Sequence, residues 1–133
     1  MQKKIAILLC LSIFALSGCS AGHNKDAAEY CDTMNRLLAD RDFSHAEVGD
    51  KVIVLYNADG AMIAEVPFAQ YDASIRILSI RKENDIVFFV TQGAVDDENG
   101  YMFLNGEENK VFDGIWYMER VSGNGYAYGT AKP

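Results

Sequence analysis

Few residues of this chain have the types and spacing that enzyme chemistry needs. Ser44, His45 and Glu47 stand close together and carry the groups of a nucleophile, a base and an orienting carboxylate. Members of such a triad meet through the fold and not through sequence neighbourhood, so the trio is interpreted as an ordinary polar loop between a helix and the first strand. The usual sequence patterns of hydrolases, zinc proteases and phosphate loops are absent. We therefore predict no enzyme and no catalytic residues, with a hydrolase that uses His45 as an alternative.

An acidic run at residues 96–100 is the best candidate for a cation site. If Asp96 opens an EF-hand loop, Glu98 and Glu107 occupy the third and twelfth positions, where ligands belong. The sixth position, which demands glycine, is however Tyr101. The fifth is a glycine without a side-chain ligand. We therefore predict a solvated turn, no metal site and no cofactor.

Aromatic residues gather toward the C-terminus and could bind a ligand. The candidate set is Trp116, Tyr117, Tyr126 and Tyr128. Tyrosine and tryptophan exposed on a sheet can stack on sugar or hold a protein partner. The alternative is that these side chains fill the core beside Phe103 and Phe112. Exposure of the set would favour binding, and complete burial would weaken that hypothesis.

The N-terminus reads as a targeting signal. Two lysines precede the apolar run of residues 5–16, which is shorter than the roughly 20 residues that cross a membrane. The residues Leu16, Ser17, Gly18 and Cys19 resemble the lipobox of bacterial lipoprotein precursors. The resemblance covers residues 1–19 alone and implies a diacylglyceryl group on Cys19 and cleavage between Gly18 and Cys19. An ordinary secretory signal with an incidental Cys19 is the competing interpretation.

That resemblance divides the chain. Residues 1–18 are expected to be a lipoprotein signal peptide, 19–25 a lipidated tether and 26–133 a single α+β domain. A tether of this length holds the domain within about 10–15 Å of the lipid. The implied location is the extracytoplasmic side of the cell membrane, and the serine after Cys19 suggests the outer membrane if the cell has two membranes.

Charge and cysteine content narrow the function further. The chain of 133 residues has a net charge of −7, and the signal peptide would remove two lysines from it. Such acidity argues against nucleic-acid binding. Cys31 is the one thiol that signal removal and lipidation would leave free. It shares a helical stripe with Ala27, Met34 and Leu38, which predicts a buried core position, with a redox or cross-linking role as the alternative.

One helix and many short strands are expected. A helix is predicted to begin at Asp26, to end near residues 40–42 and to bury Tyr30, Leu37 and Leu38 with its apolar stripe. Short apolar runs separated by turn residues then predict strands at 51–56, 61–66, 75–82, 86–92, 101–104, 111–112, 115–121 and 126–130. The run 86–92 is apolar on both faces, as in a central strand covered on both sides.

These elements predict an α+β fold, in which one N-terminal helix packs on a curved antiparallel meander sheet of about six to eight strands. A small β-barrel with an extra helix is the alternative. The leading functional hypothesis is a membrane-anchored, non-enzymatic binding or interaction module whose partner is a protein or an envelope polymer. A structural or assembly factor of the cell envelope that binds through a sheet edge is the second hypothesis.

Overall fold

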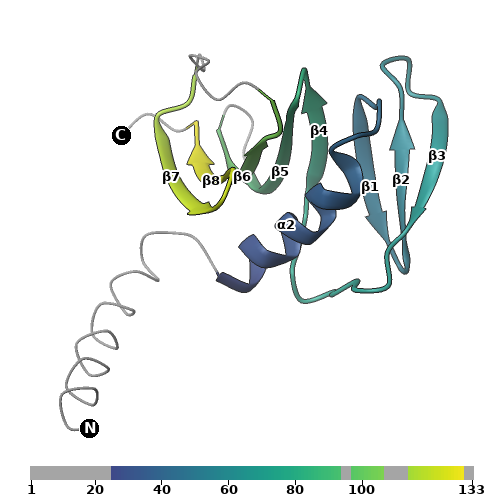
Figure 1. Cartoon of the computed structure of the whole chain (residues 1–133), viewed down its shortest axis with the longest axis horizontal. Coiled ribbons are helices and arrows are strands. Elements are labelled where there is room, and N and C mark those ends of the chain that lie inside the picture. Colours follow the sequence, from purple (N-terminus) through teal and green to yellow (C-terminus); the bar gives the residue numbers. More distant parts are fainter. Residues whose placement is uncertain (1–24, 94–96, 107–113, 131–133) are drawn as a thin grey trace, which may run out of the picture.

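The structure is a computed structural model that describes residues 25–93, 97–106 and 114–130. One helix, α2 (Lys25–Leu38), lies across one face of an eight-stranded antiparallel sheet (Figure 1). The strands are β1 His45–Gly49, β2 Val52–Tyr56, β3 Met62–Pro67, β4 Ser79–Glu83, β5 Ile86–Gly93, β6 Glu98–Leu104, β7 Tyr117–Ser122 and β8 Gly125–Gly129. The sheet is open, with β3 and β7 at its two ends. The α+β prediction is confirmed and the barrel alternative is wrong.

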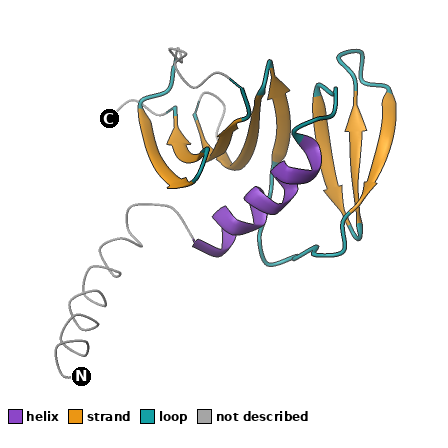
Figure 2. Ribbon diagram, in the orientation of Figure 1, coloured by secondary structure: helices purple, strands orange, loops and turns teal. Residues whose placement is uncertain are grey.

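The strand order is β3-β2-β1-β4-β5-β6-β8-β7. It departs from a simple meander at two points, because β4 lies beside β1 and β7 lies beyond β8. The pairing between β1 and β4 is short: it consists of two residue pairs, His45 with Arg81 and Ala46 with Ile80. Figure 2 shows the resulting separation into two groups of strands, with the helix packed across both. We call the side of the sheet that carries α2 the helix face and the opposite side the outer face.

The helix packs through the stripe that its sequence predicts. Ala27, Cys31, Met34 and Leu38 are all buried, in one cluster with strand residues such as Phe89 and Phe103. Burial removes their apolar surface from water, which is the main contribution to stability that an amphipathic helix makes.

Two details of the helix differ from the sequence prediction. Leu37 is 38% exposed, and Asn35 is buried instead, with 4% of its surface exposed. The helix also ends at Leu38, before residues 40–42. The Lys82 ammonium then donates to the carbonyls of Ala39 at 3.0 Å and Arg41 at 2.6 Å, and thereby satisfies acceptors that a helix end leaves open.

Strand β5 is apolar on both faces, as predicted. Val87 and Phe89 lie in the cluster beneath the helix. Ile86 and Phe88 lie in a second cluster on the outer face, with Met102, Leu104 and Tyr128. The described side chains that pack against this second cluster include Ile115, so both faces of the strand are covered.

The turns follow the sequence in part. Gly60 has a φ of 85° in the hairpin between β2 and β3, and the Asn57 side chain accepts from two backbone amides of that turn. In the hairpin between β7 and β8, Gly123 has the positive φ. Residues 45–49 form a strand where a loop was expected. The predicted strand 111–112 lies outside the described residues.

Candidate functional site

The strand β7 lies at one end of the sheet, and the two most exposed aromatic residues of the candidate set are its first residue, Tyr117, and the residue directly before it, Trp116. It pairs with β8 on one side, and among the described strands none pairs with its other edge. Trp116, Tyr117 and Met118 are 54%, 39% and 39% exposed. Three consecutive large apolar side chains at the surface of an edge strand are a feature of interaction surfaces.

The other two candidate aromatics, Tyr126 and Tyr128, are less accessible, and both lie on the outer face because they are two residues apart in β8. Tyr126 is half-buried, and the Arg120 guanidinium lies 5.2 Å from its ring centroid and donates to its hydroxyl at 2.9 Å. Tyr128 is 1% exposed and packs edge-on against Phe88. The set therefore divides into two exposed residues, one half-buried residue and one core residue.

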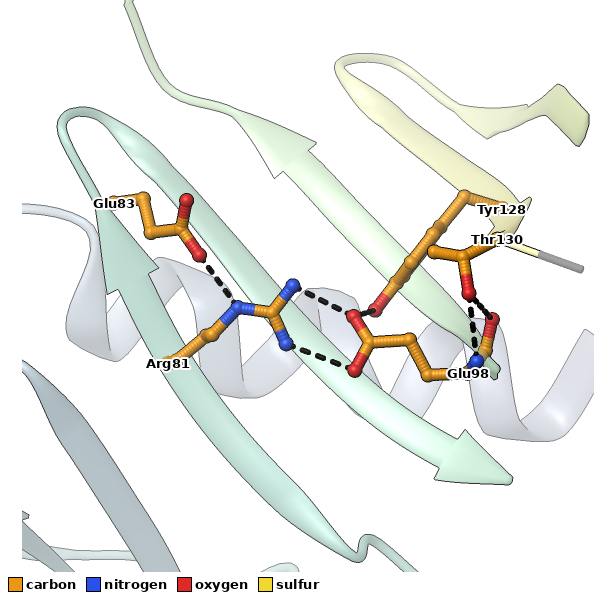
Figure 3. Close-up of polar contacts among 5 residues, drawn as sticks. All are labelled: Arg81, Glu83, Glu98, Tyr128 and Thr130. Atoms are coloured by element: carbon orange, nitrogen blue, oxygen red, sulfur yellow. Dashed lines mark hydrogen bonds and ion pairs between the residues drawn. The ribbon is translucent and has the colours of Figure 1, made fainter. Parts of the chain in front are cut away.

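Tyr128 reaches a polar cluster on the outer face (Figure 3). Arg81 on β4 donates to both carboxylate oxygens of Glu98 on β6, at 2.6 and 3.1 Å, across the intervening strand β5. Its third nitrogen donates to Glu83 at 2.6 Å. The Tyr128 hydroxyl donates to Glu98 at 3.0 Å, and the backbone amide of Glu98 donates to Thr130 at 2.8 Å.

The charged groups in this cluster are paired with one another by hydrogen bonds. Burial disfavours the ionised form of Glu98, but hydrogen bonding and charge from Arg81 outweigh it, so the pKa of Glu98 is lowered. Burial and the neighbouring Glu98 raise the pKa of Tyr128, which keeps the hydroxyl protonated and able to donate. The Arg81 guanidinium also lies 4.4 Å from the Phe88 ring centroid. The cluster joins β4, β6 and β8, and we interpret it as a structural clamp.

A hollow of about 150 Å³ lies beside Tyr117. We call it the Tyr117 hollow. Its lining residues are Thr91, Gln92, Asn99, Gly100, Tyr101, Tyr117, Ala127 and Tyr128. No charged side chain is among them. Uncharged polar groups and aromatic surface thus meet in one concave place, which is the usual composition of a small-ligand site.

A β-bulge places two amide side chains at this hollow. In β5 the alternation that puts Phe88 and Val90 on the outer face would put Gln92 there too. The register shifts between Val90 and Gln92, so that Gln92 lies opposite Asn99 on the helix face. The Asn99 amide points at the Gln92 carboxamide oxygen, with 3.4 Å between the two atoms.

Gly129 leaves room for one of these amides. Gly129 lies between Asn99 of β6 and Tyr117 of β7 in the register of the sheet. A Cβ atom on this glycine would lie 2.5 Å from the Asn99 side-chain oxygen. The missing side chain therefore lets the Asn99 amide lie over β8, toward Tyr117.

Tyr117 forms the aromatic wall of the hollow. Its hydroxyl donates to Glu119 at 2.8 Å. Partial burial and this hydrogen bond raise the pKa of Tyr117 to about 12, so the phenol is neutral at physiological pH. The hydroxyl is engaged along its own strand, and the face of the ring is the part that the hollow can offer to a ligand.

A second, larger groove of about 360 Å³ lies where the first turns of α2 meet the end of β7. It is lined by Lys25, Ala28, Glu29, Asp32, Val121 and Ser122. Asp32 already forms an ion pair with Arg36 at 2.7 Å. The groove offers charged groups of both signs without a converging set.

The three residues that could resemble a hydrolase triad do not converge. His45 is exposed and its ring stacks on Tyr56, with 4.6 Å between the ring centroids. The Tyr56 hydroxyl donates to Glu47 at 2.8 Å, and the backbone amide of Ser44 donates to the carbonyl of Tyr56. Ser44 lies at a bend directly before β1, and His45 is the first residue of that strand. The structure thus places His45 beside a tyrosine ring and gives no support to the hydrolase alternative.

The acidic residues proposed as cation ligands can be placed only in part. Asp96 and Glu107 lie outside the described residues. Glu98 begins β6 and belongs to the clamp, not to a turn. Within the described ranges, no group of three or more histidine, cysteine or acidic side chains could hold a metal ion.

Cys31 is fully buried in the helix-face core and has no disulfide partner among the described residues. Burial raises the pKa of its thiol. This is the environment of a structural cysteine.

The N-terminal residues that resemble a lipobox, Gly18 and Cys19 included, lie outside the described part of the chain. No helix within the described ranges is long and apolar enough to span a membrane. Comparison of the chain with protein-family models, with curated proteins and with solved structures finds no match.

Proposed function

We propose that this chain is a bacterial lipoprotein, anchored outside the cytoplasm by a diacylglyceryl group on Cys19, and that its α+β domain is a non-enzymatic binding module. One observation carries the binding role. Tyr117 and Met118 on the edge strand β7 and Trp116 directly before it are all exposed, and Tyr117 also lines a concave hollow. Aromatic residues and methionine are enriched in interfaces, and concave sites are the usual place for small ligands. Its partner is a protein or a polymer of the envelope.

The anchor and the module belong together physically. Two acyl chains hold a protein firmly on a membrane, because each buried methylene contributes about 0.8 kcal/mol. The described domain begins at Lys25, a few residues after Cys19, so the tether restricts it to partners near the membrane surface.

Mass spectrometry of the membrane fraction tests the anchor. We expect a mature protein that begins at Cys19 and carries the mass of the lipid. A mature protein that begins elsewhere, or lacks the acyl mass, would refute this part of the proposal.

Photo-crosslinking tests the binding surface. Benzoylphenylalanine is introduced in place of Met118 in the full-length, membrane-anchored protein, and in place of Met62 as a matched control. Met62 is an exposed methionine, 61% accessible, on β3 at the opposite end of the sheet. We expect discrete crosslinked products from position 118 and none from position 62. Absence of products at 118, or equal products at both positions, would contradict the proposal.

A second candidate function, an assembly factor of the envelope, also has an observation in its favour. The outer edge of β7 has no strand partner in the described part of the sheet, and an extended segment of another protein can add a strand to such an edge. A single protein recovered in stable amounts after crosslinking at position 118 would favour the assembly factor. Recovery of a saccharide polymer would favour the binding module.

A further inference from the structure

The lining of the Tyr117 hollow combines features that suit one class of ligand. Its described lining residues provide the aromatic ring of Tyr117, two side-chain amides from Gln92 and Asn99 and a hydroxyl from Thr91, and none of them has a charged side chain. We propose that this hollow binds one pyranose ring of a neutral carbohydrate. The inference rests on the proposed binding function, for which it names the ligand class.

The aromatic wall suits the apolar face of a sugar. The C–H groups on one side of a pyranose ring are weakly positive, and the face of an aromatic ring is negative, so the two attract when stacked. Tyr117 is 39% exposed, and its hydroxyl is held by Glu119 at 2.8 Å. That hydrogen bond fixes the orientation of the ring without occupying its face, which leaves a pre-positioned platform.

The amides suit the hydroxyl groups at the rim of the same ring. Asn99 and Gln92 contact each other through one long hydrogen bond of 3.4 Å, in which Asn99 donates. Within the described residues, the Asn99 side-chain oxygen and the Gln92 side-chain nitrogen make no other hydrogen bond, so one acceptor and one donor remain adjacent. The Thr91 hydroxyl donates to the Asn99 carbonyl at 3.3 Å and can still accept. A sugar hydroxyl both donates and accepts, and can therefore pair with either amide group.

Size and charge disfavour other ligands. A hollow of about 150 Å³ is smaller than the 300–1,000 Å³ typical of drug-sized ligands, so it accommodates a single ring and not a larger flat molecule. A charged ligand would find no opposite charge among the described lining residues and would lose hydration on entry. An extended peptide would gain most of its hydrogen bonds at the outer edge of β7, away from the amides.

Saturation-transfer NMR on the full-length lipidated protein in detergent micelles tests the proposal. The probes are N-acetylglucosamine and glucose as free sugars. We expect transfer to the ring C–H protons of at least one probe. Tyr117→Ala should raise the dissociation constant about tenfold because the stacking face is lost. Tyr117→Phe keeps that face and should bind within about threefold of the native protein, since the hydroxyl contacts Glu119 and not the ligand.

Two controls keep the test decisive. Tyr71→Ala removes a tyrosine that is 40% exposed, close to the 39% of Tyr117, but lies in the connection between β3 and β4, and should leave sugar binding unchanged. Circular dichroism of each variant shows whether it is folded, and Tyr117→Phe tests the platform even if Tyr117→Ala does not fold.

The outcomes separate this inference from the proposed function. No transfer to either sugar, or equal affinity in the native protein and a folded Tyr117→Ala variant, would overturn the carbohydrate site. If crosslinking at position 118 still captures a partner in that case, the binding module stands with a ligand of another class. Failure of both experiments would remove the proposed function as well.

Discussion

Asn35 of α2 and Asn105 at the end of β6 exchange two hydrogen bonds through their side-chain amides, at 2.9 and 2.8 Å. Asn124, in the turn between β7 and β8, donates to the same Asn105 oxygen at 2.9 Å and to the carbonyl of Leu104 at 3.1 Å. The helix, the central sheet and the hairpin that carries Tyr117 are thereby joined at one point. A buried polar group is tolerated where it is hydrogen-bonded, as the Asn35 side chain is through both its nitrogen and its oxygen.

Asn35→Ala is expected to lower the free energy of unfolding by about 1–3 kcal/mol, because it removes the acceptor of the half-buried Asn105 amide nitrogen and one of the two donors to the Asn105 side-chain oxygen. Urea unfolding followed by circular dichroism measures the change. Leu37→Ala, on the exposed side of the same helix, is the control and should change stability by less than about 0.5 kcal/mol. In the double variant Asn35→Ala/Asn105→Ala, the two losses should not add, since both remove the same pair. Full additivity would show that the amide pair is not coupled.

Glu98→Gln is expected to flatten the dependence of stability on pH. The pKa of Glu98 is lowered in the folded state, so folding favours the ionised form. That contribution is present above the unfolded pKa of about 4.3 and is lost as the pH falls through the lower folded value. The native protein should therefore exceed Glu98→Gln in stability most at neutral pH, and the difference should shrink in acid.

Urea unfolding at several values between neutral pH and about pH 3 measures this difference. The matched control is Glu65→Gln, which changes an exposed carboxylate on β3 outside the clamp. A difference for Glu98→Gln that changes with pH no more than the difference for this control would mean that Arg81 does not stabilise the ionised carboxylate.

Local patterns in the sequence predict the parts of the fold that depend on local physics. The stripe of Ala27, Cys31, Met34 and Leu38 predicts which helix face is buried, because i and i+4 side chains share a face. The two-sided apolar run of β5 predicts a central strand. The sequence pattern does not predict that the apolar Leu37 is exposed and the polar Asn35 is buried. Asn35 can be buried because Asn105, at the end of β6, supplies a hydrogen-bonding partner for its amide.

The strand order and the site depend on contacts between distant residues, which local patterns do not encode. Apolar and polar residues alternate only weakly in residues 45–49. This segment forms a strand because it pairs with β2 and β4. Arg81 and Glu98 meet across β5, 17 residues apart. Gln92 reaches the Tyr117 hollow through a bulge that reverses the face expected from strict alternation. The aromatic set named from the sequence contains both Tyr117 and Tyr128, which line the same hollow, but the sequence does not distinguish the exposed Tyr117 from the buried Tyr128.

Cys31 is expected to be inert in the folded protein. Burial raises the pKa of its thiol, and thiolate is the reactive form. Labelling with iodoacetamide at pH 8, followed by peptide mass spectrometry, should leave Cys31 unmodified in the native state and label it in urea. Labelling of native protein at the rate of a free thiol would contradict a purely structural role. Cys31→Ser should destabilise the fold by about 1–3 kcal/mol through an unpaired buried hydroxyl, and more than Cys31→Ala.

Gly125→Ala is expected to destabilise the hairpin that positions Tyr117. A Cβ atom at Gly125 would lie 2.5 Å from Cε2 and 2.9 Å from Cδ2 of Phe103. Phe103 cannot easily move aside, because it is fully buried and packs edge-on against Phe89 with 5.6 Å between ring centroids. Overpacking of this kind typically costs about 1–3 kcal/mol. Thermal unfolding should therefore show a clearly lower midpoint for this variant.

Gly49→Ala is the matched control for that substitution. A Cβ atom at Gly49 would have its nearest neighbours at 3.6 Å, which is ordinary van der Waals contact. The glycine ends β1, so its replacement should shift stability by less than about 0.5 kcal/mol. Because both changes add one methyl group to a strand glycine, their difference isolates the contact with Phe103. Equal midpoints for the two variants would show that the packing around Phe103 yields to an added methyl group, and that the close approach of β8 to this ring is not required.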